Sequence, residues 1–122
     1  MLVEKLIVST LVATVFLMAC KKETPAANYA NAADCSSLID TVNTYAKSTS
    51  SIINTNCKSC HRSSNKKGGI NLEDYASAKS VFQNGSGLCT VHKGSGCSPM
   101  PEGGSLSSAD IQKLDCWVKK WL

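Results

Sequence analysis

The chain carries at residues 57–61 the stretch Cys57-Lys58-Ser59-Cys60-His61, which has the spacing C-x-x-C-H. This pattern is typical of a site at which a c-type haem is attached covalently. Two thiols separated by two residues lie on one turn of chain, at the span of the two vinyl groups of a porphyrin. The histidine that follows lies under the ring and can bring a ring nitrogen to the iron. The stretch therefore predicts one covalent haem c, bound through Cys57 and Cys60, with His61 as an iron ligand.

Two other kinds of site share part of this pattern. A C-x-x-C pair is also the redox pair of thioredoxin-like proteins, but that pair needs a βαβ context, and no parallel-strand pattern lies nearby. The pair is also half of many zinc sites. The second half could come from Cys89 and His92, which have the spacing C-x-x-H. A zinc-stapled structural lipoprotein therefore remains an alternative.

The N-terminal residues have the pattern of an export signal. Leu6 to Ala19 is an apolar run that is short for a membrane span, and it ends at Leu17-Met18-Ala19-Cys20. This ending resembles a bacterial lipobox, in which a small residue precedes the lipidated cysteine. We therefore expect residues 1–19 to be a lipoprotein signal peptide and Cys20 to carry lipid. The protein is then exported and anchored on the periplasmic side or the cell surface of a Gram-negative bacterium; an uncleaved anchor helix is the alternative.

Residues 21–33 are rich in Ala, Asn, Lys and Pro and show no apolar period. Such a composition predicts a flexible tether, so we expect residues 20–33 to link the lipid to a folded domain at residues 34–122. The whole chain of 122 residues has a net charge of +4 without a clustered basic helix. We therefore expect no nucleic-acid partner.

The cysteines outside the haem motif and the lipobox suggest disulfides. Seven cysteines are present, and four of them remain after those assigned above: Cys35, Cys89, Cys97 and Cys116. An even remainder in an exported chain indicates two disulfides, and four cysteines permit three pairings. Cys89 and Cys97 are close in sequence and flank a glycine-containing loop, so they form the natural local pair. The other two would then tie the ends of the domain together.

Apolar residues recur at helical spacing on both sides of the haem motif. From Leu38 to Ile53 they predict one helix, or two with a break near 48–51, leading into Cys57. A helix over 72–83 is expected next, with Asn71 as its N-cap.

The C-terminal third begins without a regular pattern and ends in a helix. Residues 85–106 contain six glycines and have no regular period. Ser107, with Asp110 three residues later, resembles a capping box and predicts the start of the last helix. No strand pattern stands out, so the predicted fold class is all-α.

The order of these elements resembles that of a small monohaem cytochrome c. Ser98-Pro99-Met100-Pro101-Glu102-Gly103-Gly104 is similar to the methionine loop of that family, and residues 106–118 are similar to its last helix. Residues 68–72 are similar to a stretch of small lipid-anchored cytochromes c of Gram-negative bacteria. The resemblance covers about residues 50–122. It implies a cytochrome c-like fold of three to five helices around the haem.

The resemblance also implies a function and a second iron ligand. By this likeness Cys57 and Cys60 form the thioethers, His61 is the proximal ligand and Met100 the distal ligand, and the protein is an electron carrier rather than an enzyme. Its partners would be redox proteins: a membrane oxidoreductase, an oxidase or another cytochrome. Independently, Met100 is the only methionine after residue 19. His92 is the competing ligand, and a haem enzyme or gas sensor is the alternative if the sixth ligand is labile.

The chain departs from the family pattern at one place that matters for the iron. Many cytochromes c have Gly-Pro after the haem histidine, where a backbone carbonyl accepts from its Nδ1–H. Here the comparable stretch is Gly68-Gly69-Ile70, without proline. A carbonyl of residues 68–70 could take that role.

Overall fold

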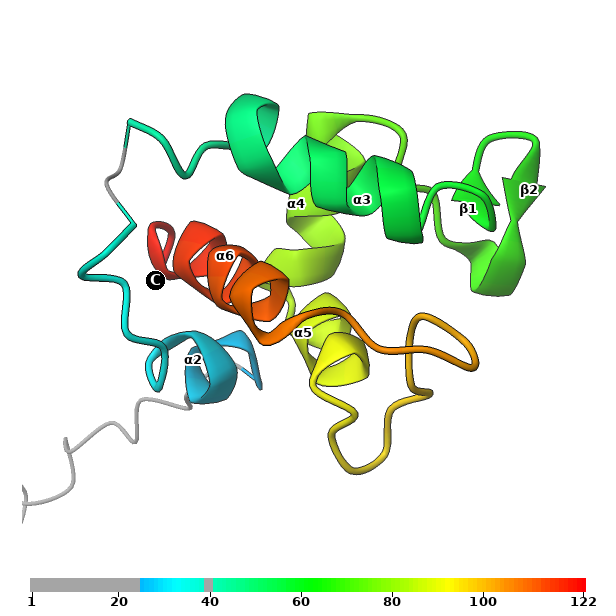
Figure 1. The fold of residues 1–122 in the computed structure, drawn as a ribbon. Helices are drawn as coiled ribbons and strands as arrows, with labels where there is room; N and C mark the ends of the chain where they lie inside the picture. The colour runs from blue at the N-terminus through cyan, green and yellow to red at the C-terminus, as the bar shows by residue number, and fades with distance from the viewer. Residues whose placement is uncertain (1–24, 39–40) are drawn as a thin grey trace, which may run out of the picture.

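The computed structural model describes residues 25–38 and 41–122, and this part of the chain is mostly helical (Figure 1). The predicted signal peptide, residues 1–19, and the predicted lipid site at Cys20 lie outside the described residues. The helices are α2 (Pro25–Ala30), a π-helical segment η2 (Tyr45–Thr49) that continues into α3 (Ser50–Asn56), α4 (Tyr75–Gln83), α5 (Ser86–Val91) and α6 (Ser108–Lys119). Within the described ranges, no helix is long and apolar enough to cross a membrane.

Two very short strands follow the C-x-x-C-H stretch. They are β1 (His61–Arg62) and β2 (Asn65–Lys66), which pair antiparallel with His61 opposite Lys66. A 3-10 turn, η3 (Lys67–Gly69), comes directly afterwards. Neither strand was predicted from the sequence, because two residues are too few to show an alternating pattern.

Helix α6 lies at the centre of the fold, in contact with α2, η2, α4 and α5 (Figure 1). The apolar side chains of these elements form one core cluster. Trp117 of α6 packs against Phe82 of α4 at 5.9 Å between ring centroids and against Tyr45 of η2 at 5.6 Å. Ile53 of α3 and Leu88 of α5 are fully buried in the same cluster. The core therefore joins the helix before the haem motif to the helix before the Met100 loop.

The helix starts agree with the sequence analysis in one case and differ in two. Ser107 caps α6, and its hydroxyl accepts from the Asp110 N–H, as predicted. The cap of α4 is Asp74 rather than Asn71. The Asn71 side chain instead accepts from the Glu73 N–H in a turn before the helix, so both side chains bond to the backbone but only Asp74 starts a helix.

The other predicted start, at Leu38, is wrong. Leu38 lies in a turn in which its N–H donates to the Cys35 carbonyl, and the helix begins only at Tyr45, after Thr44. Helix α5 was not predicted, since it is only six residues long and begins after Gly85, a residue with a φ of +91°.

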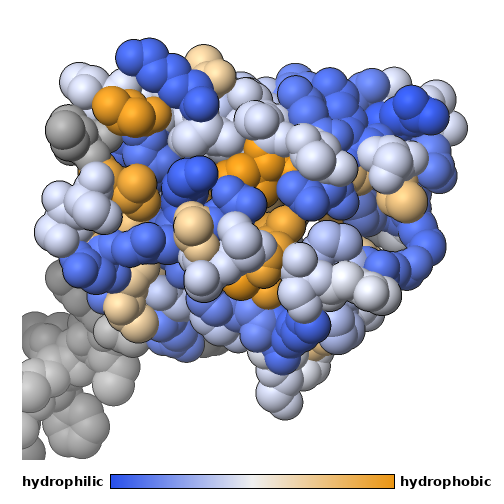
Figure 2. All heavy atoms as spheres, in the orientation of Figure 1, coloured by the Kyte–Doolittle hydropathy of each residue, from blue (hydrophilic) through white to orange (hydrophobic). Residues whose placement is uncertain are grey.

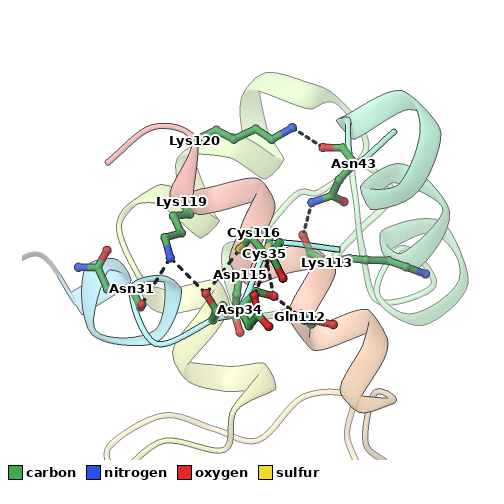
Figure 3. The surroundings of a disulfide bond; sticks show 12 residues. Asn31, Asp34, Cys35, Asn43, Gln112, Lys113, Asp115, Cys116, Lys119 and Lys120 are labelled. Carbon is green, nitrogen blue, oxygen red and sulfur yellow. Dashed lines mark hydrogen bonds between the residues drawn. A yellow bond between two sulfur atoms is a disulfide. The ribbon is translucent and has the colours of Figure 1, made fainter. Parts of the chain in front are cut away.

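Both predicted disulfides are present. Cys35 pairs with Cys116 and Cys89 pairs with Cys97. The first bridge joins the chain after α2 to the central helix α6, as Figure 3 shows. The second closes the loop that follows α5.

The predicted tether is corrected by the structure. Residues 25–30 form α2, and Ala26 and Ala30 are fully buried against α5 and α6. The composition of residues 21–33 did not indicate a buried helix, because alanine contributes little hydrophobicity to a sequence pattern. It can still be buried where a neighbouring backbone comes close, and here the neighbour is Gly85.

Candidate functional site

Helix α3 positions the C-x-x-C-H stretch. Its buried residues Ile52 and Ile53 attach it to the core, and the Cys57 N–H donates to the Ile53 carbonyl at 2.9 Å. The chain then makes one further turn, in which the N–H groups of Cys60 and His61 donate to the Cys57 carbonyl at 3.2 and 3.0 Å. The two cysteines and the histidine therefore lie on a single turn at the end of a buried helix, as their spacing predicts.

Cys57 and Cys60 are the cysteines of the described chain that form no disulfide. Both are half-buried. Burial raises the pKa of the Cys57 thiol to about 11. A thiol that stays protonated at neutral pH is a poor nucleophile in thiol–disulfide exchange, which counts against a thioredoxin-like redox pair. The pair is thus a reduced dithiol in a chain whose other described cysteines are oxidised.

His61 is held by the backbone of the β1–β2 hairpin. Its carbonyl accepts from the Leu72 N–H at 2.8 Å, and the preceding Cys60 carbonyl accepts from the Lys67 N–H at 3.0 Å. The Nδ1 atom of His61 is buried and has no hydrogen-bond partner, so no carbonyl of residues 68–70 accepts from it. The imidazole of His61 directly follows two free thiols on the same turn, and these three side chains match the donor set for a covalent haem.

The Met100 loop is fastened to α5. The Met100 N–H donates to the Thr90 carbonyl at 3.1 Å, and the Cys89–Cys97 disulfide closes the chain between them. The two ends of the loop are also joined, because the Lys93 ammonium before Met100 donates to the Ser105 hydroxyl after it at 2.6 Å. These contacts restrict the backbone on both sides of Met100.

An ion pair joins the Met100 loop to η3, the turn that follows the hairpin. The Lys67 ammonium lies 2.6 Å from a carboxylate oxygen of Glu102, although 35 residues separate them. Lys67 holds the pKa of the Glu102 carboxyl below its usual value, and His61 lies close enough to lower it further. Figure 1 shows the hairpin and the loop between α5 and α6 on the same side of the helices. The loop that carries Met100 therefore lies beside the turn that carries His61.

One face of the molecule is partly apolar. Figure 2 shows hydrophobic side chains reaching the surface in the middle of this face, between α3 and α5, with polar side chains around them. A porphyrin is a large apolar plate, and an exposed apolar surface suits such a group.

The structure does not bring together the predicted zinc ligands. Cys89 is bonded to Cys97 and has no thiolate to offer. The Nε2 atom of His92 lies 2.8 and 3.0 Å from the two carboxylate oxygens of Asp115, and its ring stacks on Tyr29 at 4.7 Å. Burial raises the pKa of Asp115, while the contact with His92 opposes that rise.

These contacts count against the zinc alternative with this ligand set, and the position of His92 also counts against it as the second iron ligand. Across residues 25–38 and 41–122, no group of three or more His, Cys, Asp or Glu side chains could hold a metal ion. Sequence reasoning missed two contacts, His92 with Asp115 and Lys67 with Glu102. No sequence pattern marks them, because their partners are 23 and 35 residues away.

The chain matches no protein family model, no curated protein and no solved structure.

Proposed function

We propose that this protein is a lipid-anchored electron carrier with one covalent haem c. The observation that carries the proposal is the group formed by Cys57, Cys60 and His61. Two free, half-buried thiols lie on one turn, directly before the imidazole of His61. The other described cysteines form two disulfides, whereas Cys57 and Cys60 are free. This difference indicates that the pair has a role other than a structural disulfide.

Each residue has a distinct role in this proposal. The thiols of Cys57 and Cys60 would hold the group covalently, and His61 and Met100 would bind its iron. When bound, haem iron supplies a one-electron couple whose potential depends on these ligands and on burial, and a methionine ligand raises it. With two protein side chains on the iron, a substrate would have no open position, which favours electron transfer over catalysis.

The loop contacts explain how the chain keeps a weak thioether ligand in place. Pro99 and Pro101 restrict the backbone on either side of Met100. The hydrogen bond to Thr90 and the Cys89–Cys97 bridge attach this segment to α5, whose Leu88 is buried in the core. Little entropy remains to be lost when the sulfur becomes a ligand.

Redox proteins that approach the hairpin side are the expected partners.

Covalent attachment is the first test. The protein, expressed with the haem-maturation machinery, should keep its haem through acid–acetone extraction and on denaturing gels. Cys57→Ala should weaken or abolish maturation. Recovery of all haem in the solvent layer would contradict the proposal.

The axial ligand is the second test, with Met100→Ala and His92→Ala as a matched pair. Loss of the thioether should remove the weak red absorption band of the oxidised protein, lower the potential and open the ferrous protein to carbon monoxide. His92→Ala should change little, because its Nε2 faces Asp115. The reverse pattern would make His92 the ligand. Ready binding of carbon monoxide by the unmodified protein would favour the enzyme or gas-sensor alternative.

A further inference from the structure

Helix α2 makes the N-terminal segment a fixed part of the domain. Ala26 and Ala30 are fully buried, and Ala27 is 8% exposed. The approach to Gly85 is very close: a Cβ atom at that glycine would lie 2.6 Å from the Ala26 nitrogen and 2.7 Å from the Pro25 Cβ. Such contacts leave no space for any side chain at residue 85. The chain therefore enters the domain at Pro25, and not at residue 34.

The last turn of α2 and the segment after it are also held in place. Tyr29 of α2 stacks on His92, and the Lys119 ammonium donates to the Ala33 carbonyl at 3.1 Å. Gln112 donates to the Asp34 carbonyl, next to the Cys35–Cys116 bridge. Figure 3 shows Gln112, Cys116 and Lys119 of α6 around the chain that follows α2. Ring stacking, hydrogen bonds and a covalent bond thus all hold residues 29–35 in place.

This attachment shortens the link between lipid and domain. An extended chain spans at most about 3.6 Å per residue, so the five steps from Cys20 to Pro25 reach about 18 Å. A link that ran to Asp34 would reach about 50 Å by the same measure. A domain of this size is about 30 Å across. The link to Pro25 is shorter than this width, whereas a link to Asp34 would be longer.

The entry point lies opposite the candidate haem site. Figure 1 shows the chain entering at α2, at one end of the molecule, with the β1–β2 hairpin at the other end. Helix α2 contacts α5 and α6. A short link therefore ties the membrane to the end of the domain opposite the β1–β2 hairpin.

We propose that the lipid surface is the partner of the α2 end of the domain, which the short link holds against the bilayer with the Cys57–His61 turn facing the aqueous phase. The redox partner is then a protein that reaches this site from the aqueous side, either soluble or projecting above the membrane. This inference rests on the proposed lipid anchor at Cys20 and the proposed haem at the hairpin. It goes beyond them by fixing the orientation of the site and the direction from which a partner approaches.

Photo-crosslinking to lipid tests the orientation. A benzophenone amino acid is placed at Asn28 of α2 or, as the matched variant, at Ser64 of the hairpin; both positions are exposed. The full-length, lipidated holoprotein is reconstituted in vesicles of phosphatidylethanolamine and phosphatidylglycerol. After illumination, the Asn28 variant should carry several-fold more lipid adduct than the Ser64 variant. Equal labelling, or more at Ser64, would overturn the proposal.

A lengthened link provides the second variant. About ten Gly and Ser residues inserted after Glu23 form a flexible coil and allow the domain to turn. The excess of adduct at Asn28 should then fall toward the level at Ser64. An unchanged excess would show that the length of the link does not orient the domain, which would also overturn the proposal.

Two controls separate this proposal from the proposed function. Intact mass shows whether Cys20 carries lipid, and the visible spectrum shows whether haem is bound. An unlipidated protein would overturn both the anchor and the orientation. A lipidated haem protein with equal labelling at the two positions would overturn the orientation alone.

Discussion

Replacing Cys35 and Cys116 together by alanine removes the bridge between the chain after α2 and the central helix α6. The matched variant replaces Cys89 and Cys97, which removes the bridge in the loop after α5. The bridges close chain segments of very different length, with sequence separations of 81 and 8 residues. The cysteines on the helices are similarly buried, with Cys116 3% and Cys89 9% exposed. The two double variants therefore differ mainly in the length of loop that they release.

The expected magnitudes follow from the entropy of the unfolded chain. In the loop-closure model a bridge of separation 81 contributes about 4.5 kcal/mol to the free energy of unfolding, and one of separation 8 about 2.5 kcal/mol. The variant without the long bridge should therefore be less stable than the other by about 2 kcal/mol. Its unfolded chain is also less constrained, so the dependence of the free energy on denaturant should become steeper.

Guanidinium unfolding of the holoprotein, followed by circular dichroism of the helices, measures both quantities. The test requires a single cooperative transition in each variant, which a second probe such as tryptophan fluorescence can check. If loss of the Cys89–Cys97 bridge costs as much as loss of the Cys35–Cys116 bridge, or more, the reasoning from chain entropy is refuted. Contacts in the folded state would then dominate the contribution of these bridges.

The remaining predictions concern the core and the helix caps. Ile53→Ala should lower the free energy of unfolding by about 3 kcal/mol, because a fully buried side chain leaves a cavity, while Val42→Ala, at a residue 57% exposed, should change it by less than about 0.5 kcal/mol; denaturant unfolding compares the two. Ser107→Ala removes the hydroxyl that accepts from Asp110 and should cost about 1 kcal/mol, seen in the same assay. Hydrogen bonds hold the pKa of Asp74 below its usual value, so its charged form stabilises the fold above the unfolded pKa. Asp74→Asn should therefore reduce stability at neutral pH, and the difference from the unmodified protein should shrink as the pH falls from about 4 through the lowered pKa of Asp74, in a series of unfolding curves; a difference that persisted below that pKa would contradict the electrostatic explanation.

Local chemistry explains which predictions succeeded. The spacing of Cys57, Cys60 and His61 needs only one turn of chain, and the backbone bonds to the Cys57 carbonyl form that turn. The Ser107 cap also depends on a contact three residues away. Hydrogen bonds between residues only a few positions apart can be predicted, because few other parts of the chain compete for the same partners.

The helix starts show where local chemistry is ambiguous. Asn71 and Asp74 are both good capping residues, and each side chain accepts a backbone N–H in the structure. The sequence does not rank them, because the two local bonds are similar in kind. The core decides, since a helix that starts at Tyr75 buries Ala78 and Phe82.

The sequence alone determined that Cys57, Cys60 and His61 lie on one turn and that Cys89 pairs with Cys97, because short spacing sets both. Only the tertiary structure decided that α2 belongs to the domain, since alanines are buried there by the close approach of Gly85. The tertiary structure also paired His92 with Asp115 and Lys67 with Glu102. These partners lie tens of residues apart, and the packing of the helices into one core is what brings them together.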